Sequence, residues 1–432
     1  MFQKYNLTPK NYIRYFFSFN TFFNIGVILL PTAPFLAAIF ILISSFKILK
    51  EKKNKFNLDK WDFYLIFISI LMIISCLFKT IFIEPNPETW SPYLSWIGLF
   101  NFLPFFYIFW ASQIYLNTIE LRIKFSKLLI IGTVPLLVSI GMQYCGFFGP
   151  YTLLKGMITW HNNSETPYAG VFKSINYLGA WLSIIWPLSY CLIYEKSRKL
   201  MKKFFMIFLT ILIITALLQT FSRAAWLNLI ISLPFIIEFS KIKWFLPLII
   251  SYVLILFTSQ LPFVPTIFKS LGEFILPERF ILRLRSFPRL EIWESAITLI
   301  TEKPILGWGA ASFPILYEMR TGNFNNHTHN LFLEIAINYG SLVSILLFFL
   351  FLFLLIKNFK ILQKKIKKKN KNNFFIYDFD KSWLICGSIF VISHLVDVQY
   401  YDLRISLLGW LLFTGIRVIN KESNQNVWIT KN

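Results

Sequence analysis

Long apolar blocks bounded by lysine and arginine residues dominate this sequence and limit what it can fold into. A helix needs about 20 apolar residues to cross the hydrocarbon core of a bilayer, and these blocks approach or reach that length. Only 15% of the residues are charged, whereas a soluble domain carries roughly 25%. We therefore predict an all-α fold, a polytopic transmembrane helical bundle, and we exclude soluble enzymes and disordered chains.

Twelve apolar segments are the predicted membrane spans. They lie at 15–30, 32–48, 61–82, 93–115, 128–146, 170–194, 204–221, 224–239, 244–260, 329–356, 382–399 and 403–418. Pro31 separates the first two, which predicts either a tight hairpin or one long bent element. The chain then divides into a transmembrane region at 1–260, a large loop at 261–328, and a second transmembrane region with a tail at 329–432.

Most of the basic residues between these segments lie in one of two alternating sets of connections. This set comprises 1–14, 47–60, 118–127, 195–203, 240–243, 357–372 and 417–432. Because connections rich in Lys and Arg stay in the cytoplasm, both termini are predicted to be cytoplasmic and the large loop periplasmic. The same rule accounts for the net charge of +22. We therefore predict no nucleic-acid partner, and we expect the lysine run at 364–369 to contact anionic membrane lipids.

The first candidate site residue is Arg223, which follows Ser222 at the turn between spans seven and eight on the outer side. Charges at the ends of membrane spans are costly, which makes them candidates for function. The alternative interpretation is an interfacial arginine that extends to a lipid phosphate.

The second candidate is Arg289, at the start of a predicted amphipathic helix on the membrane surface. Apolar residues recur there at helical spacing, at Leu290, Trp293, Ile297 and Ile300. Pro288 suits a first helical position, so Arg289 would stand beside free backbone N–H groups. Together these donors would make a diphosphate site. The alternative is a surface helix with an exposed arginine.

The third candidate is the pair His327 and His329, where the large loop meets span ten. A neutral imidazole at a helix start could take a proton from a hydroxyl nucleophile. A structural histidine and a metal ligand are the alternatives. We predict no metal, because no cluster of carboxylates accompanies the pair in the sequence and the four cysteines show no paired spacing.

The predicted topology places all three candidates on the outer face. Two arginines and a histidine suit a substrate with an anion at one end and a hydroxyl at the other, such as a lipid-linked diphosphate sugar with a sugar acceptor. The arginines would bind the diphosphate and stabilise charge on the leaving group. Asp397 and Asp402 could orient the histidine or bind sugar hydroxyls, or could instead pair with Arg404.

Four stretches of the sequence resemble motifs of a known enzyme family. They are Gly170 to Gly179, which contains Asn176; Ser222-Arg223-Ala224-Ala225-Trp226; Arg289 to Trp293 followed by Pro304-Ile305-Leu306-Gly307-Trp308-Gly309 and Phe313; and His329-Asn330-x-x-Leu333 followed by Glu334 and Gly340. In their order, their spacing and their predicted side of the membrane, these stretches are similar to the motifs of the O-antigen ligase and O-antigen polymerase superfamily of bacterial membrane glycosyltransferases. One departure is Lys173-Ser174-Ile175, where small and proline residues are more usual before the asparagine.

The resemblance implies a metal-independent, inverting glycosyltransferase of lipopolysaccharide biosynthesis, without a cofactor, in the bacterial inner membrane. Its donor would be a glycan on undecaprenyl diphosphate, and its acceptor a glycan or the lipid A core on the periplasmic face. Arg223 and Arg289 would bind the diphosphate and take part in catalysis, and His329 would be the catalytic base. Further substrate-binding positions would be Asn330, Asn176, His327 and Asp397.

Two questions of function stay open on the sequence. A ligase and a polymerase would use similar groups, so the sequence does not separate them. The alternative from another class is an anion or bicarbonate transporter. A transporter should carry its ionisable groups near the middle of the membrane, whereas the candidates here lie at the outer interface.

Overall fold

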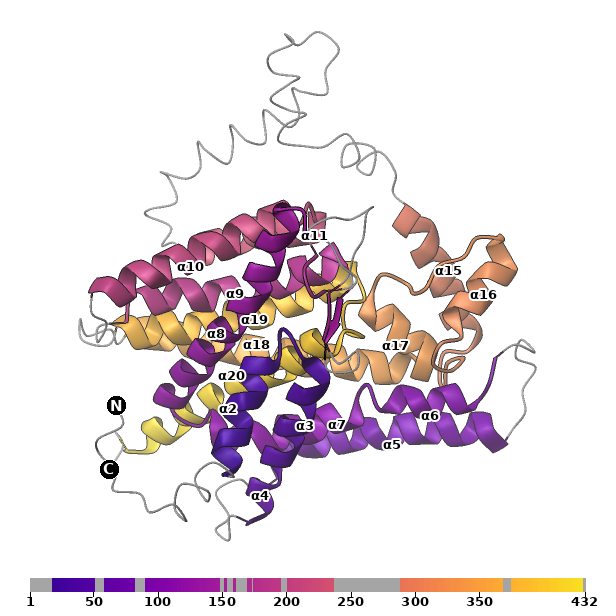
Figure 1. Ribbon diagram of the computed structural model, residues 1–432. Helices are drawn as coiled ribbons and strands as arrows, with labels where there is room; N and C mark the ends of the chain where they lie inside the picture. The colour runs from indigo at the N-terminus through magenta and orange to yellow at the C-terminus, as the bar shows by residue number, and fades with distance from the viewer. Residues whose placement is uncertain are drawn as a thin grey trace.

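The computed structural model of the protein describes residues 18–50, 58–81, 90–147, 151–153, 158–160, 169–172, 174–195, 200–236, 288–367 and 374–429 (Figure 1). The predicted span 244–260 and residues 261–287 of the predicted large loop lie outside these ranges. Within them the chain is helical, as predicted, except for a short antiparallel hairpin of β1 (Tyr151–Leu153) and β2 (Ile158–Trp160). Sequence analysis did not predict this hairpin.

Eleven helical elements of the described chain precede residue 237. They are α2 (Phe19–Leu29), α3 (Pro34–Ser45), α4 (Lys47–Lys50), α5 (Lys60–Ile81), α6 (Tyr93–Leu99), α7 (Leu103–Ala111), the 3-10 helix η1 (Ser112–Tyr115), α8 (Ile119–Tyr144), α9 (Ile175–Ile193), α10 (Leu200–Gln219) and α11 (Arg223–Ile236). The remaining helices are α15 (Pro288–Glu302), α16 (Phe313–Thr321), α17 (Leu331–Tyr339), α18 (Ser341–Lys367), α19 (Phe374–Val396) and α20 (Leu403–Ile429).

Seven stretches in the described part of the chain are long and apolar enough to cross a membrane. They are Lys60–Ile81, Tyr93–Tyr115, Ile119–Tyr144, Leu200–Gln219, Ser341–Lys365, Phe375–Val396 and Leu403–Glu422. On α10, the side chains of Phe204, Phe208 and Ile211 are each more than half exposed. A row of exposed apolar groups at helical spacing suits contact with lipid. The protein is thus a multi-pass membrane protein, and the count of twelve spans stays a prediction.

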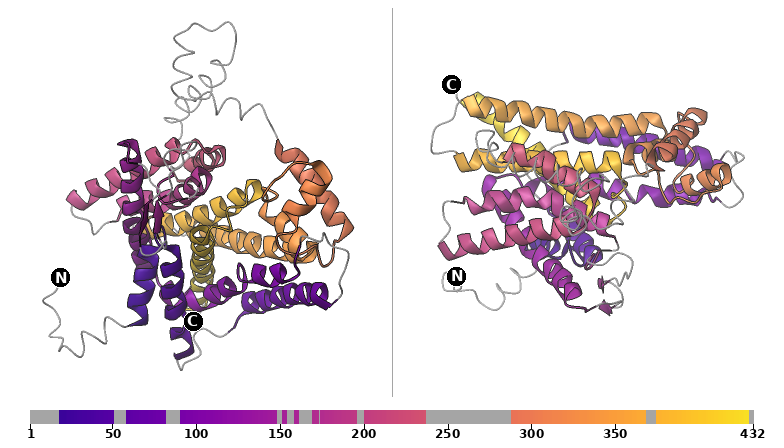
Figure 2. Two further views of the ribbon diagram at one scale, coloured as in Figure 1. Left: turned by 45° about the vertical axis from the view of Figure 1, so that its right-hand side comes forward. Right: turned by 90° about the horizontal axis from the view of Figure 1, so that it is seen from above.

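Helix α20 forms the centre of the bundle and is buried along most of its length between α7, α18 and α19 (Figures 1 and 2). Two glycines allow α19 to approach it closely. A side chain at Gly409 would meet the ring of Phe390, and one at Gly415 would meet the indole of Trp383. Small residues at such contacts let membrane helices pack tightly.

The first two predicted spans are a hairpin of two short helices rather than one bent element. Helices α2 and α3 have 11 and 12 residues, fewer than the roughly 20 needed to cross a bilayer. They pack against each other closely enough that a Cβ at Gly26 would lie 2.7 Å from Ile41.

One predicted span needs correction. The segment 329–356 is two helices, α17 and α18, separated at Gly340, whose φ is +98°. A Cβ at Gly340 would overlap the carbonyl group of Ile305. Backbone hydrogen bonds from Ser341 to Pro304 (2.8 Å) and from Trp308 to Ile337 (2.6 Å) hold the 303–309 loop across the break. The apolar pattern continues through Gly340, so hydropathy alone did not reveal the break.

Buried ion pairs join four helices at the opposite end of the bundle from α17. Arg417 of α20 donates to Asp62 of α5 at 2.7 Å. Arg122 of α8 donates to Glu422 of α20 at 2.9 Å and to Asp380 of α19 at 3.5 Å. Both guanidinium groups are almost fully buried, and such charges persist in a membrane protein only when they are paired. The structure therefore gathers several of the predicted cytoplasmic segments at one end.

We predict that Gly340→Ala destabilises the protein, because alanine is strained at this φ and its Cβ has no room beside Ile305. The expected loss is about 2 kcal/mol in the free energy of unfolding, measured as a lower apparent Tm in detergent. Gly141→Ala is the matched control, since a Cβ at Gly141 meets nothing within 4 Å. Equal Tm values for the two variants would contradict this account of the break.

Candidate active site

The His329 segment lies at the start of α17, where Asn330 connects two helices. The Asn330 Oδ1 accepts hydrogen bonds from the N–H groups of Phe332 (2.9 Å) and Leu333 (3.2 Å), which caps α17. Its Nδ2 donates to the carbonyl of Leu395 (3.0 Å) in the last turn of α19. Both the oxygen and the nitrogen of the Asn330 amide are thus hydrogen-bonded within the protein. These bonds hold the beginning of α17 against the end of α19.

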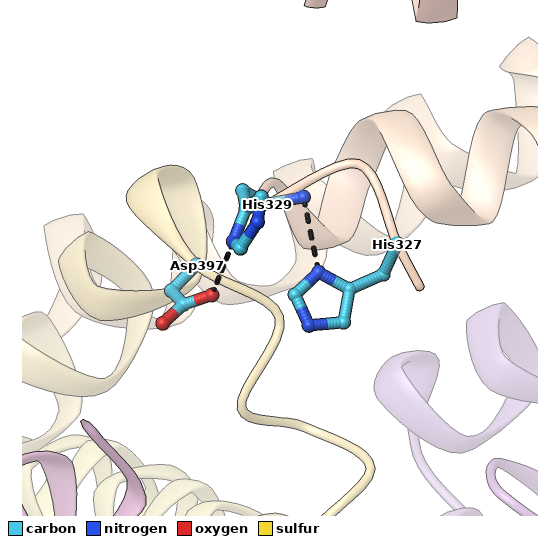
Figure 3. A group of neighbouring side chains, drawn as sticks. All are labelled: His327, His329 and Asp397. Carbon is cyan, nitrogen blue, oxygen red and sulfur yellow. Dashed lines mark hydrogen bonds and ion pairs between the residues drawn. The ribbon is translucent and has the colours of Figure 1, made fainter. Parts of the chain in front are cut away.

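This connection brings His329 to Asp397, the residue that follows α19. The His329 Nδ1 and the Asp397 Oδ1 are 2.9 Å apart (Figure 3). An ionised carboxylate only accepts, so Nδ1 carries the proton and donates it. In the neutral ring Nε2 then keeps its lone pair, which is the arrangement of a general base oriented by an acid. The His329 side chain is 25% exposed and that of Asp397 only 5%, so the imidazole is the accessible member.

The Asp397 carboxyl is ionised despite its burial. Burial by itself raises the pKa of Asp397, but the hydrogen bond from His329, the positive charge of Arg289 and the charges of the two imidazoles when they are protonated outweigh that effect. The pKa of Asp397 therefore lies below its ordinary value, and the group is an anion at neutral pH.

His327 packs beside His329, with the ring centroids 4.4 Å apart and the rings nearly perpendicular. The backbone N–H of His329 points to the His327 Nδ1 at 3.4 Å (Figure 3). Burial lowers the pKa of His327, and the charge of His329 when protonated and the positive charge of Arg289 lower it further, against the opposing effect of Asp397. His327 is therefore neutral at pH 7.

The same three residues are the ones that could hold a metal ion in the described part of the chain. His327, His329 and Asp397 offer ligand atoms within 4.8 Å of one another. Sequence analysis predicted no metal because no cluster of carboxylates accompanies the two histidines in the sequence, whereas the structure brings Asp397 beside them from 68 residues further along the chain. Two imidazoles and a carboxylate are a chemically suitable donor set for a divalent transition metal.

Arg289 lies in the first turn of α15, close enough for its charge to lower the pKa of both Asp397 and His327. No ion pair of Arg289 is present within the described ranges, so its guanidinium is available for an anion. Of the predicted apolar face of this helix, Leu290 and Ile297 are 63% and 53% exposed, and Trp293 and Ile300 are partly buried. The face that packs against α16 and α17 consists of Ile292, Ala296 and Leu299.

Arg223 is the first residue of α11, which packs against α9 and α19. Five residues further on, Asn228 donates to Ser393 of α19 (2.7 Å) and to Ser183 of α9 (3.4 Å). Ser393 lies one turn before Asp397, so α11 begins at the end of the bundle that carries the histidines. The residue two positions before Arg223, Phe221, has a φ of +48°, a strained conformation that often occurs at functional sites.

Asn176 lies in the first turn of α9, next to the loop that carries Asp397. Gln399 of that loop donates from Nε2 to the carbonyl of Asn176 at 3.3 Å. Asp402 in the same loop pairs with Arg404 at 2.9 Å. The alternative of pairing with Arg404 therefore applies to Asp402, whereas Asp397 pairs with His329.

Comparison with known families identifies part of this arrangement. A family model described as O-antigen ligase matches residues 208–349. This segment is similar to the O-antigen ligase family. The match contains Arg223, Arg289 and His329 and confirms the resemblance for three of the four motifs, whereas Gly170 to Gly179 lies outside it. No curated protein matches the chain.

One residue of the family segment had no role in the sequence analysis. Glu334, in the first turn of α17, is buried, and its Oε2 accepts the backbone N–H of Thr328 at 3.0 Å. Burial raises the pKa of Glu334 to about 7, against the lowering effects of the hydrogen bonds from Thr328 and the charge of His329. An acidic residue in an otherwise apolar helix was the signal in the sequence that could have found it.

We predict that Glu334 makes the protein less stable as the pH rises. Because its pKa is raised from 4.5 to about 7 in the folded state, its contribution to stability is fully present below 4.5 and is lost as the pH rises through 7. Glu334→Gln should remove this dependence. The difference in the free energy of unfolding between pH 5 and pH 8 should shrink by roughly 1–3 kcal/mol.

The control for this measurement is Glu302→Gln. The hydrogen bond from Arg320 lowers the pKa of Glu302, so this exposed carboxyl is ionised throughout the interval and should leave the pH dependence unchanged. A Glu334→Gln variant with the pH dependence of the wild type would contradict the assignment.

Proposed function

We propose that the protein is a membrane glycosyltransferase of the O-antigen ligase or polymerase type. It moves a glycan from an undecaprenyl-diphosphate donor to a hydroxyl of an acceptor, either a further glycan or the lipid A core, on the periplasmic face of the inner membrane. The observation that carries the proposal is the hydrogen bond between His329 and Asp397 near Arg289, whose guanidinium forms no ion pair within the described residues. The family match supports an enzyme of this general class.

The reaction is a single displacement in which His329 is the base. The His329 Nε2 removes the proton of the acceptor hydroxyl while the oxygen attacks the anomeric carbon of the donor sugar. The bond from that carbon to the diphosphate oxygen breaks, and undecaprenyl diphosphate leaves with the electron pair. Attack opposite the leaving group inverts the anomeric configuration. Asp397 holds the required tautomer and stabilises the imidazolium that forms.

The leaving diphosphate needs positive charge, which Arg289 and Arg223 provide. A guanidinium gives a planar, bidentate contact to a phosphate and needs no metal ion. The neutral ring of His327 adds no competing cation beside the base, and it supports the backbone of His329. Asn176, at the start of α9, is proposed to bind the donor sugar. Asn330 acts by holding His329 in place, since its amide atoms are engaged elsewhere.

The anion transporter is not favoured. A transporter needs ionisable groups or broken helices lining a path near the middle of the bilayer. The candidate residues instead lie at the ends of α11, α19 and α17, and the matched family is named for ligases.

The test of the proposed function is deletion of the gene followed by electrophoresis of surface polysaccharide. Loss of all capped lipid A indicates a ligase, and a cap of a single repeat indicates a polymerase. We predict that wild-type protein restores the pattern and that His329→Ala does not, although it inserts normally in the membrane. Unchanged polysaccharide in the deletion strain would reject the proposal.

Two carboxylates of one loop provide a matched pair for this experiment. Asp397→Asn should reduce the transfer rate by about 10-fold or more, because it disturbs the partner that orients the base. Asp402→Asn alters only the pair with Arg404 and should stay near wild type. Chelation with EDTA should leave the rate unchanged. A loss that a divalent cation restores would instead assign His327, His329 and Asp397 to a metal.

We also predict that Arg289→Lys binds the donor about 10-fold more weakly, because lysine cannot make the bidentate contact. Donor binding to purified protein in detergent measures this directly. Arg320→Lys is the control, since Arg320 belongs to the neighbouring helix α16 and pairs with Glu302 at 2.6 Å. Donor binding by Arg289→Lys at the level of the control would count against the diphosphate role.

A further inference from the structure

We propose that Glu334 is a positioning residue that fixes the backbone of the His329 segment, so that the imidazole stays against Asp397. The inference rests on the proposed role of His329 as the base. It concerns how the protein holds that base, and no substrate contact of Glu334 is involved.

The backbone at His329 needs to be held. Its φ is +53°, one of three positive values among the non-glycine residues of the described chain. A residue with a Cβ is strained in this conformation, and the conformation persists only where its surroundings determine it. Relaxation of φ would swing the imidazole away from Asp397, which is anchored separately at the end of α19.

Side chains hold the segment on both sides of His329. On the C-terminal side of His329, Asn330 caps α17 and its side chain donates to the carbonyl of Leu395. On the N-terminal side, the N–H of Thr328 donates to the Glu334 Oε2 at 3.0 Å. The Thr328 hydroxyl also donates to the carbonyl of Asn330 at 2.7 Å. Glu334 is thus the side chain that fixes the backbone immediately before the base.

The setting of Glu334 favours this role over simple stabilisation. The carboxyl is buried, 3% exposed, and forms no ion pair with a lysine or arginine in the described ranges. Two titratable groups interact with this carboxyl: His329 lowers the pKa of Glu334, and Glu334 raises the pKa of Tyr401. A buried carboxyl without an ion pair lowers the stability of a protein. Such groups are retained mainly at functional sites.

Glu334 is not an alternative base. Its carboxyl is almost fully buried, whereas the His329 side chain is 25% exposed and can meet an acceptor. Because Glu334 acts through a hydrogen bond to the backbone, a replacement that keeps an acceptor oxygen should keep the function. A replacement without an acceptor should release the segment even when it fills the same space.

The experiment compares Glu334→Ala, Glu334→Met and Glu334→Gln in a transfer assay with purified protein and lipid-linked donor. The alanine and methionine variants should lose at least about 10-fold in kcat, while KM for the donor changes less than about 3-fold. Methionine preserves the volume, so it keeps the test valid if the alanine variant fails to fold. The glutamine variant should stay within about 3-fold of the wild type, because its amide oxygen can accept the Thr328 N–H. Glu302→Ala, an exposed carboxylate paired with Arg320, is the matched control.

Two results would overturn the proposal. The first is a methionine variant with wild-type kcat. The second is a glutamine variant as slow as the methionine variant, which would mean that the charge matters and not the acceptor. His329→Ala in the same assay separates this failure from failure of the proposed function. An active His329→Ala variant rejects the base itself, whereas an inactive one beside a fully active Glu334→Met variant rejects only the positioning role.

Discussion

The hydrogen bond between His329 and Asp397 is the interaction on which the site depends, because it joins residues 68 positions apart. Neither residue is placed by its own helix alone. The side chain of Asn330 links the first turn of α17 to the last turn of α19, and the imidazole and carboxylate meet as a consequence. The chemistry of the site is therefore set by how two helix ends are joined.

Charges are arranged differently at the two ends of the bundle. At the end that carries the predicted cytoplasmic segments, Arg417 and Arg122 are buried and paired with carboxylates on neighbouring helices. Such pairs fix helices relative to one another and leave little charge for a ligand. At the other end, Arg289 has no ion pair within the described residues, and Asp397 is paired with an imidazole instead. One end is thus suited to holding the bundle together and the other to binding an anion.

Three irregular backbone positions of the described chain lie in or beside the helices that carry the site residues. Phe221 and His329 both have positive φ values, and Gly340 marks the break between α17 and α18. Lys79 of α5 donates to the carbonyls of Leu306 (2.6 Å) and Gly307 (2.8 Å). Buried polar backbone groups that no helix satisfies need such partners. The rigid helices around them supply these partners, which allows strained segments to keep one geometry.

The sequence by itself determined the helical membrane architecture, because continuous apolar runs satisfy the backbone only as helices in a bilayer. It also pointed to Arg289 and His329, since charge and imidazole are unexpected in such surroundings. Tertiary structure alone decided that Asp397 pairs with His329 and Asp402 with Arg404, because the pairing depends on which side chains folding packs beside each carboxylate. It likewise decided the break at Gly340, where the apolar pattern continues and only the backbone of the 303–309 loop, brought there by folding, requires the chain to turn.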